Sequence, residues 1–393
     1  MATFASRIGD VVSRIAAELK TVRQQITSYS LSGGFVAPPA KGIADLGLAA
    51  VGAGRIAYVT DTFGGPCVAF SDGQVWRRVQ DWGIVTKFFD FASGRLPAGS
   101  QFRRAGTAYR MGPNGLLSLE AIDGPRFDYR PVTAQLRGLL LEGAATNYVG
   151  WSEDVSNSAG WGQVLTASSD AVLAPNGTMT ADLCVPGTAT NNYGNTSNSA
   201  ASFVNGMPFT FSIYAKAAGY RYVRLSCTPS VFNQGRHGVF DLVAKVCTGD
   251  TANVSCALEE LPNGWFRCSM TITAQATVSA TAMTFGVLNN YVAGPVSFAG
   301  DGVSGIVFWG AQVEAGAQAS SYVPTPSSAT AVTRSADALV TLWQTRGVAD
   351  GIITIRVTFD DGTTQDVATT VTLGQATVPT PLNRARILLA ERV

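Results

Sequence analysis

The most regular hydrophobic pattern in the chain lies within residues 1–30. Apolar residues recur there with alternating spacings of three and four residues, over four heptads without a break. They are Ala5, Ile8, Val12, Ile15, Leu19, Val22, Ile26 and Tyr29. β-Branched residues at both heptad core positions favour three chains over two. We therefore expect residues 1–30 to form a coiled-coil stalk or anchor, with these eight residues in the oligomerisation contacts of a homotrimer.

Charged residues beside this pattern support a contact between chains. Glu18 and Arg23 lie five residues apart at heptad positions g and e, which is the spacing of an interchain ion pair in a parallel coiled coil. The alternative is a single amphipathic helix that packs on its own domain, although an isolated helix of this length is only marginally stable. The Gly33-Gly34 and Pro38-Pro39 pairs that follow predict a linker over residues 31–53.

Beyond this linker the pattern changes to the period-two alternation of β-strands. Residues 54–82 predict a small β unit that includes a hairpin around Ser71-Asp72-Gly73. Residues 83–134 are rich in glycine, arginine and aromatic residues, and we expect a linker or irregular segment there. Residues 338–393 predict a C-terminal β domain with a hairpin around Asp360-Asp361-Gly362.

Residues 135–337 show the short strands and frequent turns of a sandwich or barrel. The strand candidates are 209–215, 220–227, 238–243, 254–258, 265–273, 281–288 and 305–313. In residues 209–215 apolar and polar positions alternate, so one face of that strand should lie in a core and the other in solvent. The expected fold is mostly β, arranged in an elongated homotrimer.

Composition narrows the classes of function. Hydrophobic residues make up 46% of the chain and charged residues only 14%, well below the usual quarter. The net charge is +1 and basic residues form no runs, so we expect no nucleic-acid partner. No run of 18 apolar residues and no secretory signal occur, so we expect no membrane insertion. The six cysteines form no C-x-x-C motif and are expected to be free thiols of a protein made in a reducing cytoplasm.

Catalytic and nucleotide-binding motifs are weak. His237 is the only histidine, and no G-x-S-x-G motif accompanies it, so a Ser-His-Asp hydrolase is not indicated. The glycines Gly52 and Gly54 begin a dinucleotide-like pattern, but a strand candidate follows where a helix is needed. Adjacent carboxylates on a strand point to opposite faces and do not form a glycosidase pair. We expect no enzyme, no catalytic residue and no metal site or cofactor, although loop oxygens could hold a structural calcium ion.

Several motifs follow one another within residues 135–337. They are 139–148, 151–154, 211–224, 238–242, 263–268, 308–316 and 321–325. In order and spacing they resemble a domain of the tail and head fibre (spike) proteins of tailed phages and gene transfer agents. The resemblance implies a jelly-roll sandwich of the carbohydrate-binding-module type on the exterior of a virion that is assembled in the bacterial host cytoplasm. It also implies attachment to capsid or tail proteins through the N-terminus.

Two loop segments have the composition of a sugar site, in which aromatic faces cover the ring and amides reach its hydroxyls. Their residues are Asn191, Asn192, Tyr193 and Asn195 in one segment, and Asn289, Asn290 and Tyr291 in the other. The alternative interpretation is that these are ordinary loop asparagines. We expect a fibre protein that adheres to bacterial surface polysaccharide. A purely structural role in the particle and a polysaccharide depolymerase are the alternatives.

Overall fold

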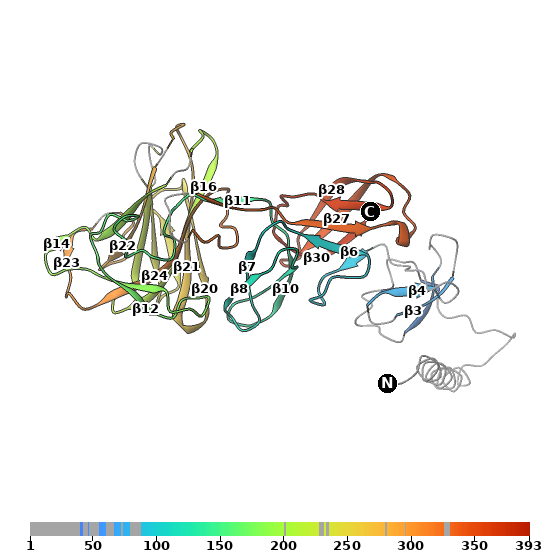
Figure 1. Cartoon of the computed structure of the whole chain (residues 1–393), viewed down its shortest axis with the longest axis horizontal. Helices are drawn as coiled ribbons and strands as arrows, with labels where there is room; N and C mark the ends of the chain where they lie inside the picture. Colours follow the sequence, from blue (N-terminus) through green and yellow to red (C-terminus); the bar gives the residue numbers. More distant parts are fainter. Residues whose placement is uncertain are drawn as a thin grey trace. The chain divides into compact units, whose positions relative to one another are not determined.

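The computed structural model describes most of the chain after residue 87 and short stretches before it (Figure 1). The described residues are 40–41, 46, 55–59, 67–71, 74–78, 88–199, 202–227, 232, 236–279, 281–294, 296–325 and 331–393. The coiled coil expected over residues 1–30, with its eight core residues, lies outside them. The described part is mostly β, as predicted, and its only helical elements are the 3-10 turns Pro262–Gly264 and Gln344–Arg346. None of its helices is long and apolar enough to cross a membrane.

The chain divides into two compact units, residues 1–86 and residues 87–393. The first unit contains one sheet of four strands in the order β1-β2-β3-β4. Its strands are β1 (Ala40–Lys41), β2 (Ile56–Val59), β3 (Cys67–Ser71) and β4 (Trp76–Arg78). The antiparallel pairing of β3 with β4 forms the hairpin expected around residues 71–73. Leu46, Ala57, Val59, Ala69 and Trp76 are buried together as the core of this unit.

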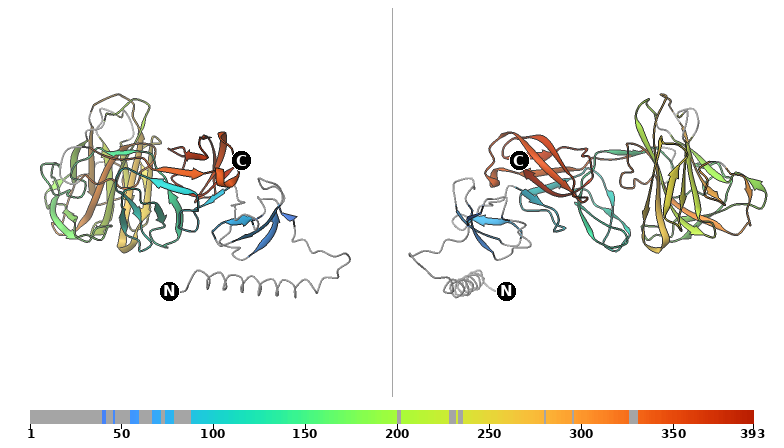
Figure 2. Two further views of the ribbon diagram at one scale, coloured as in Figure 1. Left: turned by 45° about the vertical axis from the view of Figure 1, so that its right-hand side comes forward. Right: turned by 180° about the vertical axis from the view of Figure 1, so that it is seen from behind.

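The second unit contains a large sandwich of two antiparallel sheets, which we call the central sandwich (Figures 1 and 2). Its six-strand sheet has the order β12 (Thr166–Val172), β13 (Ala181–Val185), β24 (Gly305–Ala315), β16 (Pro208–Ala218), β21 (Trp265–Thr273) and β20 (Val254–Glu260). Its five-strand sheet has the order β15 (Gly194–Ser199), β22 (Thr281–Leu288), β17 (Tyr222–Cys227), β18 (His237–Asp241) and β19 (Val246–Gly249). The short strands β14 (Thr190–Asn191) and β23 (Phe298–Ala299) pair beside them. Strands β16, β17, β18, β20, β21, β22 and β24 lie at the seven candidates expected over residues 209–313, whereas the other strands of this sandwich were not among the candidates.

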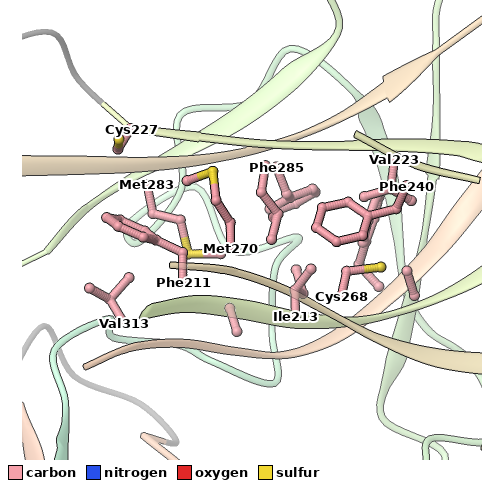
Figure 3. Close-up of a cluster of buried hydrophobic side chains, with 14 of the residues drawn as sticks. Phe211, Ile213, Val223, Cys227, Phe240, Cys268, Met270, Met283, Phe285 and Val313 are labelled. Carbon is pink, nitrogen blue, oxygen red and sulfur yellow. The ribbon is translucent and has the colours of Figure 1, made fainter. Parts of the chain in front are cut away.

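The core of the central sandwich lies between its two sheets (Figure 3). Phe211 and Ile213 of β16 face Val223 of β17 and Phe285 of β22, and all four are fully buried. Because side chains on a strand alternate between faces, the residues between these positions lie on the outer faces of the sandwich. The outer face of each sheet is therefore set by the same alternation that builds the core.

The two outer faces have different surroundings. On the outer face of the six-strand sheet, Tyr214 and Trp309 are buried in an apolar cluster with Met111 and Leu117. Met111 and Leu117 belong to the hairpin of β7 (Ala108–Met111) and β8 (Leu117–Glu120). This face is thus partly covered by apolar packing, whereas the outer face of the five-strand sheet carries mainly polar residues.

A second sandwich, the terminal sandwich, combines strands from residues 88–140 with strands from residues 338–392. One sheet has the order β28 (Thr364–Val371), β27 (Gly351–Phe359), β30 (Arg386–Arg392), β10 (Leu136–Leu140) and β9 (Arg126–Tyr129), and β5 (Phe88–Asp90) also pairs with β30. The other has the order β29 (Gln375–Val378), β26 (Ala338–Leu342) and β6 (Ser100–Arg103). Phe89, Phe102, Leu339 and Trp343 are among the residues buried in its core.

The expectation of an irregular segment over residues 83–134 is therefore wrong for its described residues 88–134. Strands β5 to β9 are only three or four residues long. Strands this short contain too few alternating positions to be recognised by period, and the partners of β5 and β6 lie more than 200 residues away. The hairpin expected around Asp360-Asp361-Gly362 is present as β27 and β28.

The chain passes between the two sandwiches twice, through β11 (Ala145–Asn147) and β25 (Val332–Arg334), which pair with each other. Beside this passage lies a group of buried charges that we call the connector cluster. Its members are Arg104, Arg126, Glu142, Arg334 and Asp337. Arg126 contacts both carboxylates, at 2.9 Å for Glu142 and at shorter range for Asp337. The flanking arginines hold the pKa of Glu142 at about 2 against the opposing effect of burial.

Candidate functional site

The outer face of the five-strand sheet presents its side chains in rows across the strands. Val223 and Leu225 of β17 point into the core, so Tyr222, Arg224 and Ser226 point outward. In the register of the sheet, Arg224 lies between Val239 of β18 and Gly286 of β22. The next row across the strands contains His237, Ser226, Thr284 and Thr196. Polar side chains and glycines therefore dominate the middle of this face.

Arg224 occupies the centre of this face and is only 3% exposed. Its Nη1 donates a hydrogen bond to Oδ1 of Asn192 at 2.8 Å. Its Nε is buried and has no hydrogen-bond partner. No carboxylate forms an ion pair with this guanidinium within the described residues. Burial lowers the pKa of Arg224, since the charged form has lost its hydration.

Two glycines lie directly against this guanidinium. A Cβ atom on Gly286 would lie 3.4 Å from Nη2 and 3.5 Å from Nε of Arg224. A Cβ atom on Gly194 would lie 3.1 Å from the same Nη2. Gly194 and Gly286 are paired neighbours on β15 and β22. The guanidinium therefore rests on bare backbone, along the edge formed by its Nε and Nη2 atoms.

His237 and Asp250 lie on one side of Arg224. Asp250 accepts the backbone N–H of Arg236 through Oδ2 at 2.9 Å, while its Oδ1 is buried without a partner. Nδ1 of His237 is buried without a partner as well. The pKa of His237 is lowered, chiefly because the ring is half-buried, and Arg224 and Arg236 contribute to this shift. The imidazole is therefore neutral at pH 7 and can exchange hydrogen bonds with a hydroxyl group.

Aromatic side chains lie on the other side of Arg224. The rings of Tyr222 and Tyr291 are 6.1 Å apart between centroids. The guanidinium carbon of Arg221 lies 5.0 Å from the centroid of the Tyr222 ring. Arg221 also forms an ion pair with Asp241. Tyr291 is 37% exposed, and Asn289 and Asn290 beside it are exposed too. Tyrosine rings next to a guanidinium and an amide are the kinds of group that bind sugar rings and their hydroxyls.

The structure brings the two predicted Asn-Asn-Tyr segments to the same face of the five-strand sheet. Asn192 contacts Arg224, and Tyr291 contacts Tyr222, which lies two residues from Arg224 on β17. Asn191 is exposed on β14 and accepts the backbone N–H of Asn192. Side chains two residues apart on a strand lie about 7 Å from each other, so both contacts belong to one patch of this face.

Tyr193 and Asn195 are placed differently from the expectation. The Tyr193 hydroxyl donates to the carbonyls of Gly187 and Ala189, and its ring is buried against Phe298. Asn195 is fully buried and accepts the backbone N–H groups of Val164 and Leu165 at 2.9 Å. These two side chains stabilise loops and do not face a ligand in this structure, because the alternation of β15 and the local turns direct them inward.

A separate groove of about 670 Å³ runs along β20 and β21 beside residues of the terminal sandwich. Arg137 bridges Glu259 at 3.6 Å and Asp360 at 2.6 Å within it, and Arg384 pairs with Asp361 at 3.2 Å. None of the described residues that line the groove is aromatic. Its carboxylates are thus engaged by arginines, and it offers no ring for a sugar to stack on.

A metal site is not apparent in the described part of the chain. It contains no group of three or more His, Cys, Asp or Glu side chains placed to hold a metal ion. The free cysteines are Cys184, Cys227, Cys247, Cys256 and Cys268. Burial raises the pKa of Cys256 to about 12, so its thiol is protonated at neutral pH.

Sequence reasoning missed Arg224, His237, Asp250 and Tyr222 as members of the site. Arg224 stands between two core residues of β17, so its outward position follows from strand alternation alone. Its isolation from carboxylates and its glycine floor depend on the register of β15, β22 and β17, which the sequence does not provide.

Comparison with known proteins finds partial similarities. No family model matches the chain, and no curated protein matches its sequence. Among solved structures, the enzymatically active domain of tailspike protein 4 of bacteriophage CBA120 aligns over 43% of this chain and 21% of its own, at 13% identity and a TM-score of 0.27. A CBM4 structure aligns over 35% of this chain and 72% of its own, at 14% identity and a TM-score of 0.22.

A third similar structure contains the CBM22-1 and GH10 modules of endo-1,4-β-D-xylanase 10B of Clostridium thermocellum, complexed with xylohexaose. It aligns over 47% of this chain and 30% of its own, at 14% identity and a TM-score of 0.24. The chain thus spans less than a third of the tailspike and xylanase chains. The structural neighbours include a phage tailspike domain and carbohydrate-binding modules, but TM-scores this low do not establish a common fold. The function of this chain must therefore be argued from the residues of its own site.

Proposed function

We propose that this protein is a non-enzymatic fibre or spike protein on the exterior of a phage-like particle, and that it binds polysaccharide on bacterial surfaces. The outer face of the five-strand sheet is the proposed binding surface. The observation that carries this proposal is the meeting of both predicted Asn-Asn-Tyr segments on that face, with Tyr291 against Tyr222 and Asn192 on Arg224.

The chemistry of this face suits a sugar chain. Tyrosine rings can cover the apolar face of a pyranose, while an amide, a neutral imidazole and a carboxylate can reach its hydroxyls. Unpartnered buried atoms on His237 and Asp250 favour such a ligand, because a buried polar group without a hydrogen bond costs about 1–3 kcal/mol.

Binding without cleavage is favoured by the carboxylates of this face. A glycosidase needs two carboxyl groups that face each other across the scissile bond. Asp241 is paired with Arg221 and also accepts the backbone N–H groups of Val243 and Ala244. Asp250 is left as the single acid with a free oxygen near Arg224. A face with one available carboxylate matches adhesion better than hydrolysis.

Oligomerisation would strengthen weak binding. In the proposed homotrimer, residues 1–30 hold three copies together and attach them to capsid or tail proteins. Three linked copies raise the effective concentration at the second and third sites, so that modest affinity for one site becomes firm attachment. This part of the proposal rests on the heptad pattern of the sequence.

The test uses the full chain and purified surface polysaccharides of candidate host bacteria. Wild type should bind at least one of them, and Tyr222→Ala together with Tyr291→Ala should weaken binding at least about tenfold, since stacking on aromatic rings is lost. Ile352→Ala is the control, because Ile352 is exposed on the terminal sandwich, away from the site. Absence of binding to every preparation would favour a purely structural role, and new reducing ends after incubation would indicate a depolymerase.

A further inference from the structure

We propose that Arg224 forms a carboxylate-binding subsite on the outer face of the five-strand sheet, and that the bound polysaccharide carries acidic sugars of the hexuronate type. The inference deepens the proposed function and rests on it for the identity of the ligand. The existence of an anion subsite can be tested separately.

The buried guanidinium of Arg224 has no counter-ion among the described residues. Transfer of an arginine from water into a protein interior is costly unless an anion pairs with it. Arg224 is 3% exposed, and its single hydrogen bond goes to the neutral Asn192. Arg236 lies close enough to His237 to affect it and also has no carboxylate partner among the described residues. With Asp250 as the single carboxylate beside them, the local charge is +1.

The guanidinium of Arg224 has N–H donors that no described residue accepts. Nη1 of Arg224 is used by Asn192, while Nε and Nη2 make no hydrogen bond within the described residues. Nε and Nη2 share one edge of the planar guanidinium, and their parallel N–H groups match the two oxygens of a carboxylate. The bare backbone of Gly194 and Gly286 runs along that edge. The unused edge therefore lies against glycine backbone, where no Cβ atom takes up space.

A sugar carboxylate suits these groups better than a phosphate monoester, which is close to a dianion at pH 7. Asp250 lies near the site with one unpartnered oxygen, and its negative charge repels a dianion more strongly than a monoanion. The same oxygen and the neutral His237 ring can bond hydroxyl groups. Tyr222, two residues along β17, supplies a ring for stacking. A carboxylate with hydroxyls and a pyranose ring next to it satisfies all of these groups.

The experiment compares a hexuronate oligosaccharide with its carboxyl-reduced, neutral counterpart by calorimetry on the full chain at pH 7. Wild type should bind the acidic form at least about tenfold more tightly, which is the effect of one charge-assisted hydrogen-bonded pair. A parallel thermal denaturation compares glucuronate, glucose, phosphate and sodium chloride at matched ionic strength. Glucuronate should raise the melting temperature of the wild type more than the other three.

Two variants address Arg224 in opposite ways. Arg224→Gln removes the charge, and Asn192→Asp places a carboxylate 2.8 Å from it as an internal counter-ion. Both should lose the preference for the acidic oligosaccharide, and Asn192→Asp should do so with an unchanged or raised melting temperature. Arg356→Gln is the charge-matched control, because Arg356 is an exposed residue paired with Asp366 on the terminal sandwich. It should retain the preference.

The outcomes separate the subsite from the proposed function. Equal binding of the acidic and reduced oligosaccharides would overturn the subsite and leave adhesion standing. Stabilisation by glucuronate without binding of either oligosaccharide would support the subsite and remove the proposed adhesion. Equal stabilisation by phosphate and glucuronate would overturn the assignment to a sugar carboxylate, and retention of the preference by Asn192→Asp would exclude Arg224 as its source.

Discussion

Buried arginines occur in several regions of the chain, and two of these regions differ in what balances the arginine charge. In the connector cluster, Arg104, Arg126 and Arg334 contact the carboxylates of Glu142 and Asp337. On the outer face of the five-strand sheet, Arg224 is buried with one amide as its partner. A buried arginine that pairs with carboxylates of its own chain contributes to the stability of the fold. A buried arginine without such a counter-ion is stabilised by an anion that binds to it. The comparison therefore separates a structural group of arginines from a candidate binding residue.

The largest effect should follow from breaking the connector cluster. Asp337→Asn keeps the shape of the side chain and removes its charge, which leaves Arg104 and Arg126 with less compensation in a buried site. We expect a loss of about 3–5 kcal/mol in the free energy of unfolding, measured by denaturant titration. Asp366→Asn, in an exposed pair with Arg356, should leave the unfolding midpoint unchanged within error. Equal effects of the two substitutions would remove the distinction between buried and exposed pairs.

Acid should weaken the connector cluster through Glu142. Its pKa in the folded chain is about 2, below the ordinary value of 4.5, so its stabilising effect is complete above pH 4.5 and is lost as the pH falls toward 2. The difference corresponds to about 3 kcal/mol. Denaturant midpoints measured between pH 5 and pH 2 should fall for the wild type and fall less for Glu142→Gln. Parallel curves for the two proteins would contradict this role of Glu142.

The smallest effect on stability should come from Arg224. Arg224→Met removes a buried charge without a counter-ion and loses one hydrogen bond to Asn192, so the two effects oppose each other. We expect a change within about 1 kcal/mol in either direction, measured by the same denaturant titration. A loss as large as that of Asp337→Asn would show that Arg224 is a structural residue, like Arg126.

Strand alternation accounts for how much of the fold was predictable. Strands such as β16 and β21 alternate over nine or more residues, and their positions follow from the sequence. The strands of residues 88–129 are too short to show a period, and their partners include β26 and β30, far along the chain. The pairing of the two chain segments in the terminal sandwich was therefore missed.

The candidate site was predictable only in part, because composition does not show the direction of a side chain or the register of its strand. Composition selected Asn192 and Tyr291 as candidates, because amides and aromatic rings are the groups expected at a sugar site. It could not separate them from Tyr193 and Asn195, whose side chains turn inward to bond local backbone groups. Arg224 becomes informative only when the register places two glycines beneath it and no carboxylate near it.

The pairing of β11 with β25 has a consequence for how such a protein can change its specificity. Ala145 and Arg334 are paired residues, so the chain enters and leaves the central sandwich at one point. The terminal sandwich is completed by segments before and after that point, so its strand pairing does not include the strands inserted between them. Insertions whose two ends meet are tolerated by a host domain. Under the proposed function, exchange of the segment between these residues would change the receptor preference of the same scaffold.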